Sequence, residues 1–130
     1  MEGRVFRFQN YTKKYEETCD FYERTLKLPI ITKRETAYED RVRVYKLGSG
    51  QIEVIYLPDD MDAPVSNGWT LQVEVENADR VFEEAQRNGN IIGREPCDQF
   101  WGHRNCKLID PTGFELTFYH NISKEEELHD

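Results

Sequence analysis

The segment Gln99-Phe100-Trp101-Gly102-His103-Arg104 gathers two aromatic rings, an imidazole and a guanidinium within six residues. Its glycine and flanking polar residues are typical of a hairpin between two strands. The indole of Trp101 can stack on a planar or cationic ligand. It can equally pack against a dimer interface or fill the open end of a sheet, and both interpretations stay open. His103 is expected to hydrogen-bond with the backbone of the hairpin and not to transfer protons.

The three cysteines, Cys19, Cys97 and Cys106, are odd in number and show no C-x-x-C spacing. They are therefore interpreted as reduced thiols of a cytosolic protein. Cys97 and Cys106 flank the expected hairpin and should lie opposite one another, although a direct cross-strand disulfide is often strained. A metal cluster of these two thiols with His103 is not favoured, because paired strands do not bring three such ligands together.

The charge balance excludes some partners. Seventeen Lys and Arg residues stand against 25 Asp and Glu residues, for a net charge of −8 and a pI near 4.9. Nucleic acid is not expected as a partner, since phosphate binding needs a basic surface. Cationic or neutral small molecules suit the chain better. Apolar runs are shorter than the roughly 20 residues that a membrane span needs, and no signal-like segment is evident, so a cytoplasmic location is expected.

Hydrophobic periodicity predicts the same order of elements twice: strand, helix and three strands. The first set comprises a strand at 4–9, a helix that Thr12 can cap and Pro29 ends, and strands at 30–35, 41–47 and 51–57. The second comprises a strand at 69–75, a helix capped by Asn77, and strands at 91–95, 104–109 and 114–120. We therefore expect one domain, 1–130, with module one at 1–57, a linker at 58–67, module two at 68–122 and an acidic tail at 123–130.

Four motifs in this order resemble the vicinal oxygen chelate superfamily, which contains glyoxalases, bleomycin-resistance proteins and ring-cleaving dioxygenases. They are Asp20-Phe21-Tyr22-Glu23-Arg24-Thr25-Leu26, Ile52-Glu53-Val54, Trp101-Gly102-His103-Arg104 and Asp110-Pro111-Thr112-Gly113. The resemblance implies an α+β fold in which two βαβββ modules form an open U-shaped mixed sheet. Helices would cover its convex side and a ligand its concave side. Many members are homodimers, so a homodimer is expected.

Superfamily members that use a metal hold it with four side chains, one on the first and one on the last strand of each module. The resemblance places Arg7, Glu53, Thr70 and Thr117 at these positions. Only Glu53 is a good ligand, because a guanidinium has no lone pair to donate and hydroxyls bind transition metals weakly. A register slip of two residues would offer Gln72 and Glu115 instead. No metal and no cofactor are therefore expected.

Without a metal, Glu53 and Arg7 should lie on neighbouring strands of one cleft. They could form a structural ion pair, anchor a polar ligand, or use Glu53 as a catalytic base. Alternation adds three further side chains to the concave face: Tyr45, Gln72 and Tyr119.

The favoured hypothesis is a metal-independent binding protein for a small polar, aromatic or cationic ligand, with sequestration of a toxic compound as one version. Its ligand would contact Arg7, Tyr45, Glu53, Gln72, Trp101, Thr117 and Tyr119. A second hypothesis is a glyoxalase-like lyase or isomerase with Glu53 as base or metal ligand. A third is a structural or partner-binding module whose cleft has lost its function.

Overall fold

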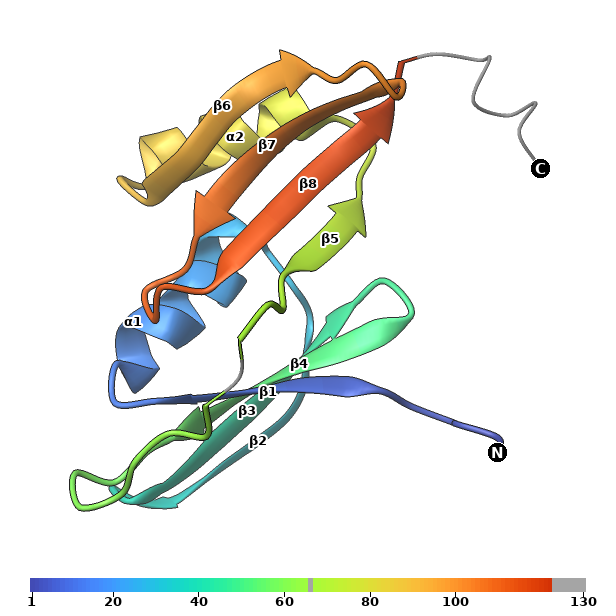
Figure 1. Ribbon diagram of the computed structural model, residues 1–130. Coiled ribbons are helices and arrows are strands. Elements are labelled where there is room, and N and C mark those ends of the chain that lie inside the picture. The colour runs from blue at the N-terminus through green and yellow to red at the C-terminus, as the bar shows by residue number, and fades with distance from the viewer. Residues whose placement is uncertain (66, 123–130) are drawn as a thin grey trace. The chain divides into compact units, whose positions relative to one another are not determined.

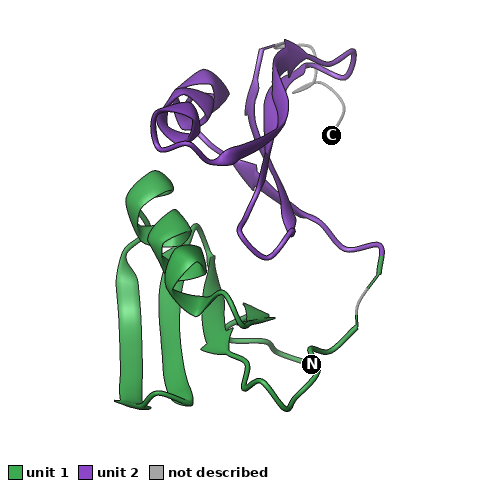
Figure 2. Ribbon diagram, turned by 90° about the vertical axis from the view of Figure 1, so that its left-hand side faces the viewer, with its two compact units in different colours: residues 1–67 green, residues 68–130 purple. Residues whose placement is uncertain are grey.

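The computed structural model describes residues 1–65 and 67–122 (Figure 1). The chain divides into two compact units, Met1–Asn67 and Gly68–Asp130, which we call module one and module two (Figure 2). The boundary falls at the end of the segment 58–67 that was predicted to be a linker. The predicted acidic tail, 123–130, lies outside the described residues.

Module one is a four-stranded sheet with one helical segment. The strand order is β1-β4-β3-β2, in which β1 runs parallel to β4 and the other neighbours are antiparallel. Its elements are β1 (Arg7–Thr12), α1 (Tyr15–Asp20), the π-helix η1 (Phe21–Thr25), β2 (Ile30–Ala37), β3 (Asp40–Leu47) and β4 (Gly50–Tyr56).

The helical segment of module one forms because its apolar residues recur at three- and four-residue steps. Tyr15, Phe21 and Tyr22 are fully buried, together with Ile52 and Val54 of β4. The periodicity predicts one helix, but the α-helix passes into a five-residue π-helix at Phe21. The helical segment ends before Pro29, as predicted.

The first strand begins later than the alternation suggests. It was predicted at 4–9, whereas β1 spans Arg7–Thr12. Pairing with β4 sets this register, because Arg7 lies beside Gln51 and Thr12 beside Tyr56. The Thr12 hydroxyl then accepts a hydrogen bond from the backbone of Lys14, 2.9 Å away, so the strand leads directly into the helix.

Module two repeats the arrangement with strand order β5-β8-β7-β6, β5 being parallel to β8. Its elements are β5 (Leu71–Glu74), α2 (Ala78–Arg87), β6 (Ile91–Asp98), β7 (His103–Ile109) and β8 (Glu115–Asn121). As predicted, Asn77 caps α2, accepting hydrogen bonds from the backbone of Asp79 and Arg80. Figure 1 shows α2 lying across one face of this sheet.

The core of module two lies between α2 and its sheet. The fully buried side chains there are Ala78, Ala85, Cys106, Leu108 and Leu116. The α+β class and the two βαβββ modules are therefore confirmed. No helix among residues 1–65 and 67–122 is both long and apolar enough to cross a membrane.

Candidate functional site

Each sheet has one face that packs against the helix of its own module and one that does not. We call the second the open face of that module. Residues that pair across strands share a face, so the strand register assigns every side chain to one side. On the open face of module one, the polar side chains include Arg7, Gln9, Thr32, Arg34, Lys46, Gln51 and Glu53.

Glu53 and Arg7 lie on neighbouring strands of the same open face, as expected, but they do not pair with one another. Gln9, not Arg7, lies opposite Glu53, and its amide donates to the Glu53 carboxylate at 2.9 Å. Arg7 instead donates from Nε to the side-chain oxygen of Gln51, also at 2.9 Å. The structural Arg7–Glu53 ion pair, one of the three alternatives for these residues, is therefore wrong, because the register of β1 places each residue beside an amide.

Tyr45 was expected on the same face as Glu53, and this expectation is also wrong. Tyr45 pairs with Ile52, so it lies on the helix-facing side of the sheet. Its side chain is fully buried, and its ring stacks on that of Tyr22 with centroids 6.0 Å apart. It has no access to a ligand on the open face.

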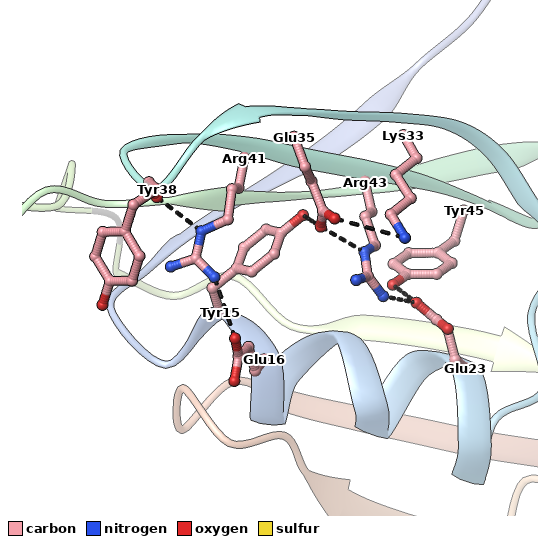
Figure 3. A network of polar contacts seen from close by, with 9 residues as sticks. All are labelled: Tyr15, Glu16, Glu23, Lys33, Glu35, Tyr38, Arg41, Arg43 and Tyr45. Carbon is pink, nitrogen blue, oxygen red and sulfur yellow. Dashed lines mark hydrogen bonds and ion pairs between the residues drawn. The ribbon is translucent and has the colours of Figure 1, made fainter.

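The helix-facing side instead carries a polar network centred on Arg43 of β3 (Figure 3). Arg43 donates to Glu23 of η1 at 2.5 Å and to Glu35 of β2 at 2.9 Å. The hydroxyl of Tyr45 donates to the same Glu23 oxygen at 2.6 Å, and that of Tyr15 to Glu35 at 2.8 Å. We call these five residues the Arg43 network. It joins the helical segment to two strands by charge-assisted hydrogen bonds.

Arg41, two residues earlier on β3, extends this side of the sheet with cation–π contacts. Its guanidinium carbon lies 4.7, 4.4 and 4.5 Å from the ring centroids of Tyr15, Tyr38 and Tyr56. Its Nε also donates to the backbone oxygen of Tyr38 at 2.7 Å. Arg41 therefore ties the β2–β3 turn to the helical segment and is already occupied by the protein itself.

The Arg43 network shifts the ionisation of its members. Burial opposes the charge of Glu23, but hydrogen bonds from Tyr45 and Arg43 outweigh burial and lower its pKa. The pKa of Glu35 is lowered in the same way, with hydrogen bonds from Arg43 and Tyr15 outweighing burial. Burial and a hydrogen bond to Glu35 raise the pKa of Tyr15. The network is therefore held as two carboxylates, one guanidinium and two neutral phenols at neutral pH.

These shifts predict how stability depends on pH. Because the pKa values of Glu23 and Glu35 are lower in the folded protein, the unfolded chain binds protons first as the pH falls. Their stabilising contribution should be complete above the ordinary glutamate pKa of about 4.3 and decline below it. Urea unfolding at pH 7, 5, 4 and 3 should show this decline, and Glu23→Gln should make it shallower. A free energy of unfolding that stays level down to pH 3 would contradict the assignment.

The open face of module two carries most of the remaining predicted residues. Gln72, Thr117, Lys107 and Arg94 form one row across its four strands. The adjacent row consists of Glu74, Tyr119, Asn105 and Cys97. The structure thus brings Gln72, Thr117 and Tyr119 together, as the alternation predicts.

An aromatic series leads from this face to the β6–β7 hairpin. The ring of Tyr119 stacks on His103 with centroids 4.0 Å apart and planes 14° apart. His103 meets the edge of Trp101 at 6.2 Å, and Trp101 meets Phe100 at 4.9 Å. Trp101 is 41% exposed and Phe100 is 96% exposed. The series therefore begins in the sheet and ends in two rings that the described part of the chain leaves partly uncovered.

Beside this series, Arg94 of β6 donates from Nη2 to the side-chain oxygen of Asn105. The same oxygen accepts a hydrogen bond from Gln99 at 3.1 Å, and Gln99 also contacts the sulfur of Cys97 at 3.0 Å. The Nε atom of Arg94 is buried and has no hydrogen-bond partner among the described residues. Lys107, the next residue in its row, is paired with Glu115 at 3.4 Å.

Cys97 and Cys106 do not lie opposite one another, so that expectation is wrong. A register irregularity in β6 pairs Cys97 with Asn105, and Cys106 pairs with Phe118. Cys97 therefore lies on the open face, and Cys106 lies beneath α2, where burial raises the pKa of its thiol to about 11. Both are free thiols.

Comparison with known proteins identifies the family. The profile of the Glyoxalase/Bleomycin resistance protein/Dioxygenase superfamily matches residues 4–118. The chain belongs to this superfamily. No curated protein matches the sequence.

Solved structures of superfamily type share the fold at low sequence identity. TioX from Micromonospora sp. ML1 is 17% identical, with 92% of this chain and 99% of that chain covered and a TM-score of 0.73. A glyoxalase/bleomycin resistance protein/dioxygenase from Alicyclobacillus acidocaldarius is 20% identical over 95% and 96% of the two chains, with a TM-score of 0.67. A glyoxalase I mutant from Zea mays is 14% identical over 92% of this chain and 47% of that one, with a TM-score of 0.75.

The residues at the superfamily's metal positions do not fit a metal. In module one, Arg7 is a cation and Glu53 already accepts a hydrogen bond from Gln9. In module two, Thr70 and Thr117 offer only hydroxyls, which bind transition metals weakly. Within residues 1–65 and 67–122, no three His, Cys, Asp or Glu side chains gather in a way that could hold a metal ion.

Sequence reasoning missed two features of this superfamily member. The first is the Arg43 network, although Glu23 directly follows the buried Tyr22 in the helical segment. The second is the group formed by Arg94, Asn105 and Gln99. The register irregularities of β6 bring this group together, and Gly93 and Pro96, which lie within them, are the sequence signal that could have revealed them.

Proposed function

We propose that this superfamily member binds a small planar molecule on the open face of module two, without a metal. The observation that carries the proposal is the aromatic series from Tyr119 through His103 to Trp101. It lies beside polar side chains of the same face. Flat rings at the edge of a polar sheet are suited to hold a ligand that is both planar and hydrogen-bonding.

The exposed rings supply the apolar part of the binding energy. Trp101 and Phe100 form the tip of the β6–β7 hairpin, and both present ring surface to solvent. Covering about 100 Å² of this surface with a flat ligand would contribute about 2.5 kcal/mol. The indole can stack on any planar system, and its electron-rich face also accepts cations.

The polar part of the site would set the ligand's orientation. Thr117 and Gln72 lie directly opposite one another and offer a hydroxyl and an amide. These groups donate and accept hydrogen bonds without carrying charge. Sequestration of a toxic or antibiotic-like compound is the form of binding that we favour, since such binding needs no reacting group.

Tryptophan fluorescence tests this proposal. We would titrate the protein with bleomycin, acridine orange and 2-naphthamide, which carry planar ring systems and differ in charge. At least one should bind with micromolar to submillimolar affinity, and Trp101→Ala should weaken that binding about tenfold, which corresponds to about 1.4 kcal/mol. Trp69→Phe is the matched control, because Trp69 is exposed and lies outside β5. Equal affinity in the wild type and Trp101→Ala, or no binding by any probe, would refute the proposal.

A further inference from the structure

Within residues 67–122, the guanidinium of Arg94 has no acidic partner. Among the ion pairs of residues 67–122, none involves Arg94, whereas Arg104 on the opposite face is paired with Asp79 and Asp98. Its only hydrogen-bond acceptor in the described part of the chain is the neutral amide of Asn105. A neutral amide can orient a guanidinium, but it cannot balance its charge.

The surroundings hold this cation in place. Arg94 is half-buried, its Nε atom is covered, and Asn105, which receives its Nη2 hydrogen bond, is fully buried. Gln99 donates to the same Asn105 oxygen and so fixes the acceptor from the other side. A positioned charge of this kind binds better than one on a freely moving side chain, because less side-chain entropy is lost on binding.

Two carboxylates share this face with Arg94 and Lys107, those of Glu74 and Glu115, and neither forms an ion pair with Arg94. Lys107 and Glu115 neutralise one another at 3.4 Å, and Glu74 accepts a hydrogen bond from Asn121 at 3.5 Å. Arg94 is therefore the one cation of this face, among the described residues, that no carboxylate balances. The outer nitrogens of a guanidinium form a planar fork that matches a carboxylate, and a single positive charge balances a single negative one.

We propose that Arg94 anchors a carboxylate of the ligand, so that the ligand class is a planar aromatic carboxylate. The inference rests on the proposed function, since the ring system of the ligand would stack against the side chains of the aromatic series. Asn105 lies opposite Tyr119 on the next strand, which places the guanidinium and the aromatic series within about two strand spacings, roughly 10 Å.

This assignment reverses the expectation drawn from net charge. The chain as a whole carries −8 charges, which suggests cationic or neutral ligands. Charges farther than about 8 Å are largely screened at physiological ionic strength, whereas a direct contact with Arg94 is not. The guanidinium of Arg94 therefore determines the sign of the ligand's charge.

Three probes with one ring system test the inference: 2-naphthoate, 2-naphthamide and 2-naphthylmethylammonium. Calorimetric titration should show that the wild type binds 2-naphthoate about tenfold more tightly than the amide or the ammonium. Arg94→Gln should reduce 2-naphthoate affinity to that of the amide and leave amide affinity unchanged. Lys107→Gln is the matched control from the same row, and it should change 2-naphthoate affinity less than threefold because that charge is already paired.

The failures of the two proposals are distinguishable. If the amide binds through Trp101 but the carboxylate binds no more tightly, or if Arg94→Gln has no effect, the inference is wrong and the proposed function stands. If none of the three probes binds, both fail. Should Arg94→Gln not fold, nuclear magnetic resonance of the wild type decides: the Arg94 Nε–H signal should move with 2-naphthoate and not with 2-naphthamide. The same shift with both probes, or with neither, would overturn the assignment.

Discussion

Replacement of Arg43 by methionine should lower the free energy of unfolding by about 3 kcal/mol. Removing one partner of a mostly buried ion pair leaves the others uncompensated, and full burial would make the loss about 3–5 kcal/mol. Here Arg43 is 20% exposed and its two carboxylate partners, Glu23 and Glu35, are 31% and 24% exposed, so the lower end applies. Glu23 and Glu35 would then lose the guanidinium that they share and keep only the hydrogen bonds from Tyr45 and Tyr15.

Arg34→Met is the matched control for this prediction. Arg34 also makes an ion pair from the sheet, with Asp40 at 2.9 Å, but its side chain is 62% exposed. Exposed pairs contribute at most about 1 kcal/mol. Urea unfolding of both variants checks the comparison. In thermal unfolding, the midpoint of the Arg43 variant should lie roughly 10 °C below that of the wild type. If the two variants lose the same amount of stability, the Arg43 network does not hold the helical segment to the sheet.

Replacement of Asp110 by alanine should have an effect of similar size, about 2–3 kcal/mol. Asp110 is fully buried in the β7–β8 turn, and its Oδ1 atom accepts three hydrogen bonds. They come from the backbone and hydroxyl of Thr112, at 2.9 and 2.5 Å, and from the backbone of Phe114, at 2.9 Å. Alanine removes the acceptor of all three hydrogen bonds, and a loss of about 1 kcal/mol for each is expected, because the donors are only partly buried.

Asp110→Asn is the matched control here, because asparagine keeps an oxygen at the same position. It should lose less than half as much stability as the alanine variant in the same unfolding experiment. An asparagine variant as unstable as the alanine variant would show that the charge of Asp110, and not its acceptor geometry, stabilises the turn.

The sequence predicted the elements well because their signals are local. The turn at Asp110-Pro111-Thr112-Gly113 follows from residue chemistry, and Gly113 indeed adopts a positive φ of 91° and donates to Asp110 at 2.9 Å. Asn77 likewise marks the start of α2 with a side chain that needs no tertiary partner. Two rounds of the same periodicity were enough to predict two βαβββ modules.

The positions of side chains were harder to predict because they depend on register and on partners far along the chain. Tyr45, which shares its face of β3 with Arg43, was placed on the open face because it alternates with Val42 and Val44. The assignment is reversed, since Glu23 and Glu35 make it favourable to bury a guanidinium beneath the helix. The hydrophobic periodicity of β3 cannot predict this burial, because Glu23 and Glu35 lie outside that strand.

The same limit applies to the candidate site. Gln72, Thr117 and Tyr119 were grouped correctly because β5, β7 and β8 pair without irregularities. Arg94 was not recognised because the register shifts of β6 decide which residues it faces. Strand β1 likewise begins later than the sequence predicts, so Gln9, and not Arg7, lies beside Glu53.

The central claim is that module two binds a planar ligand without a metal. The most direct measurement is a calorimetric titration of the protein with 2-naphthoate, before and after exhaustive dialysis against EDTA. We predict the same affinity in both preparations, and a loss of affinity in Trp101→Ala in both. Binding that disappears on dialysis and returns on addition of zinc or nickel would contradict the account.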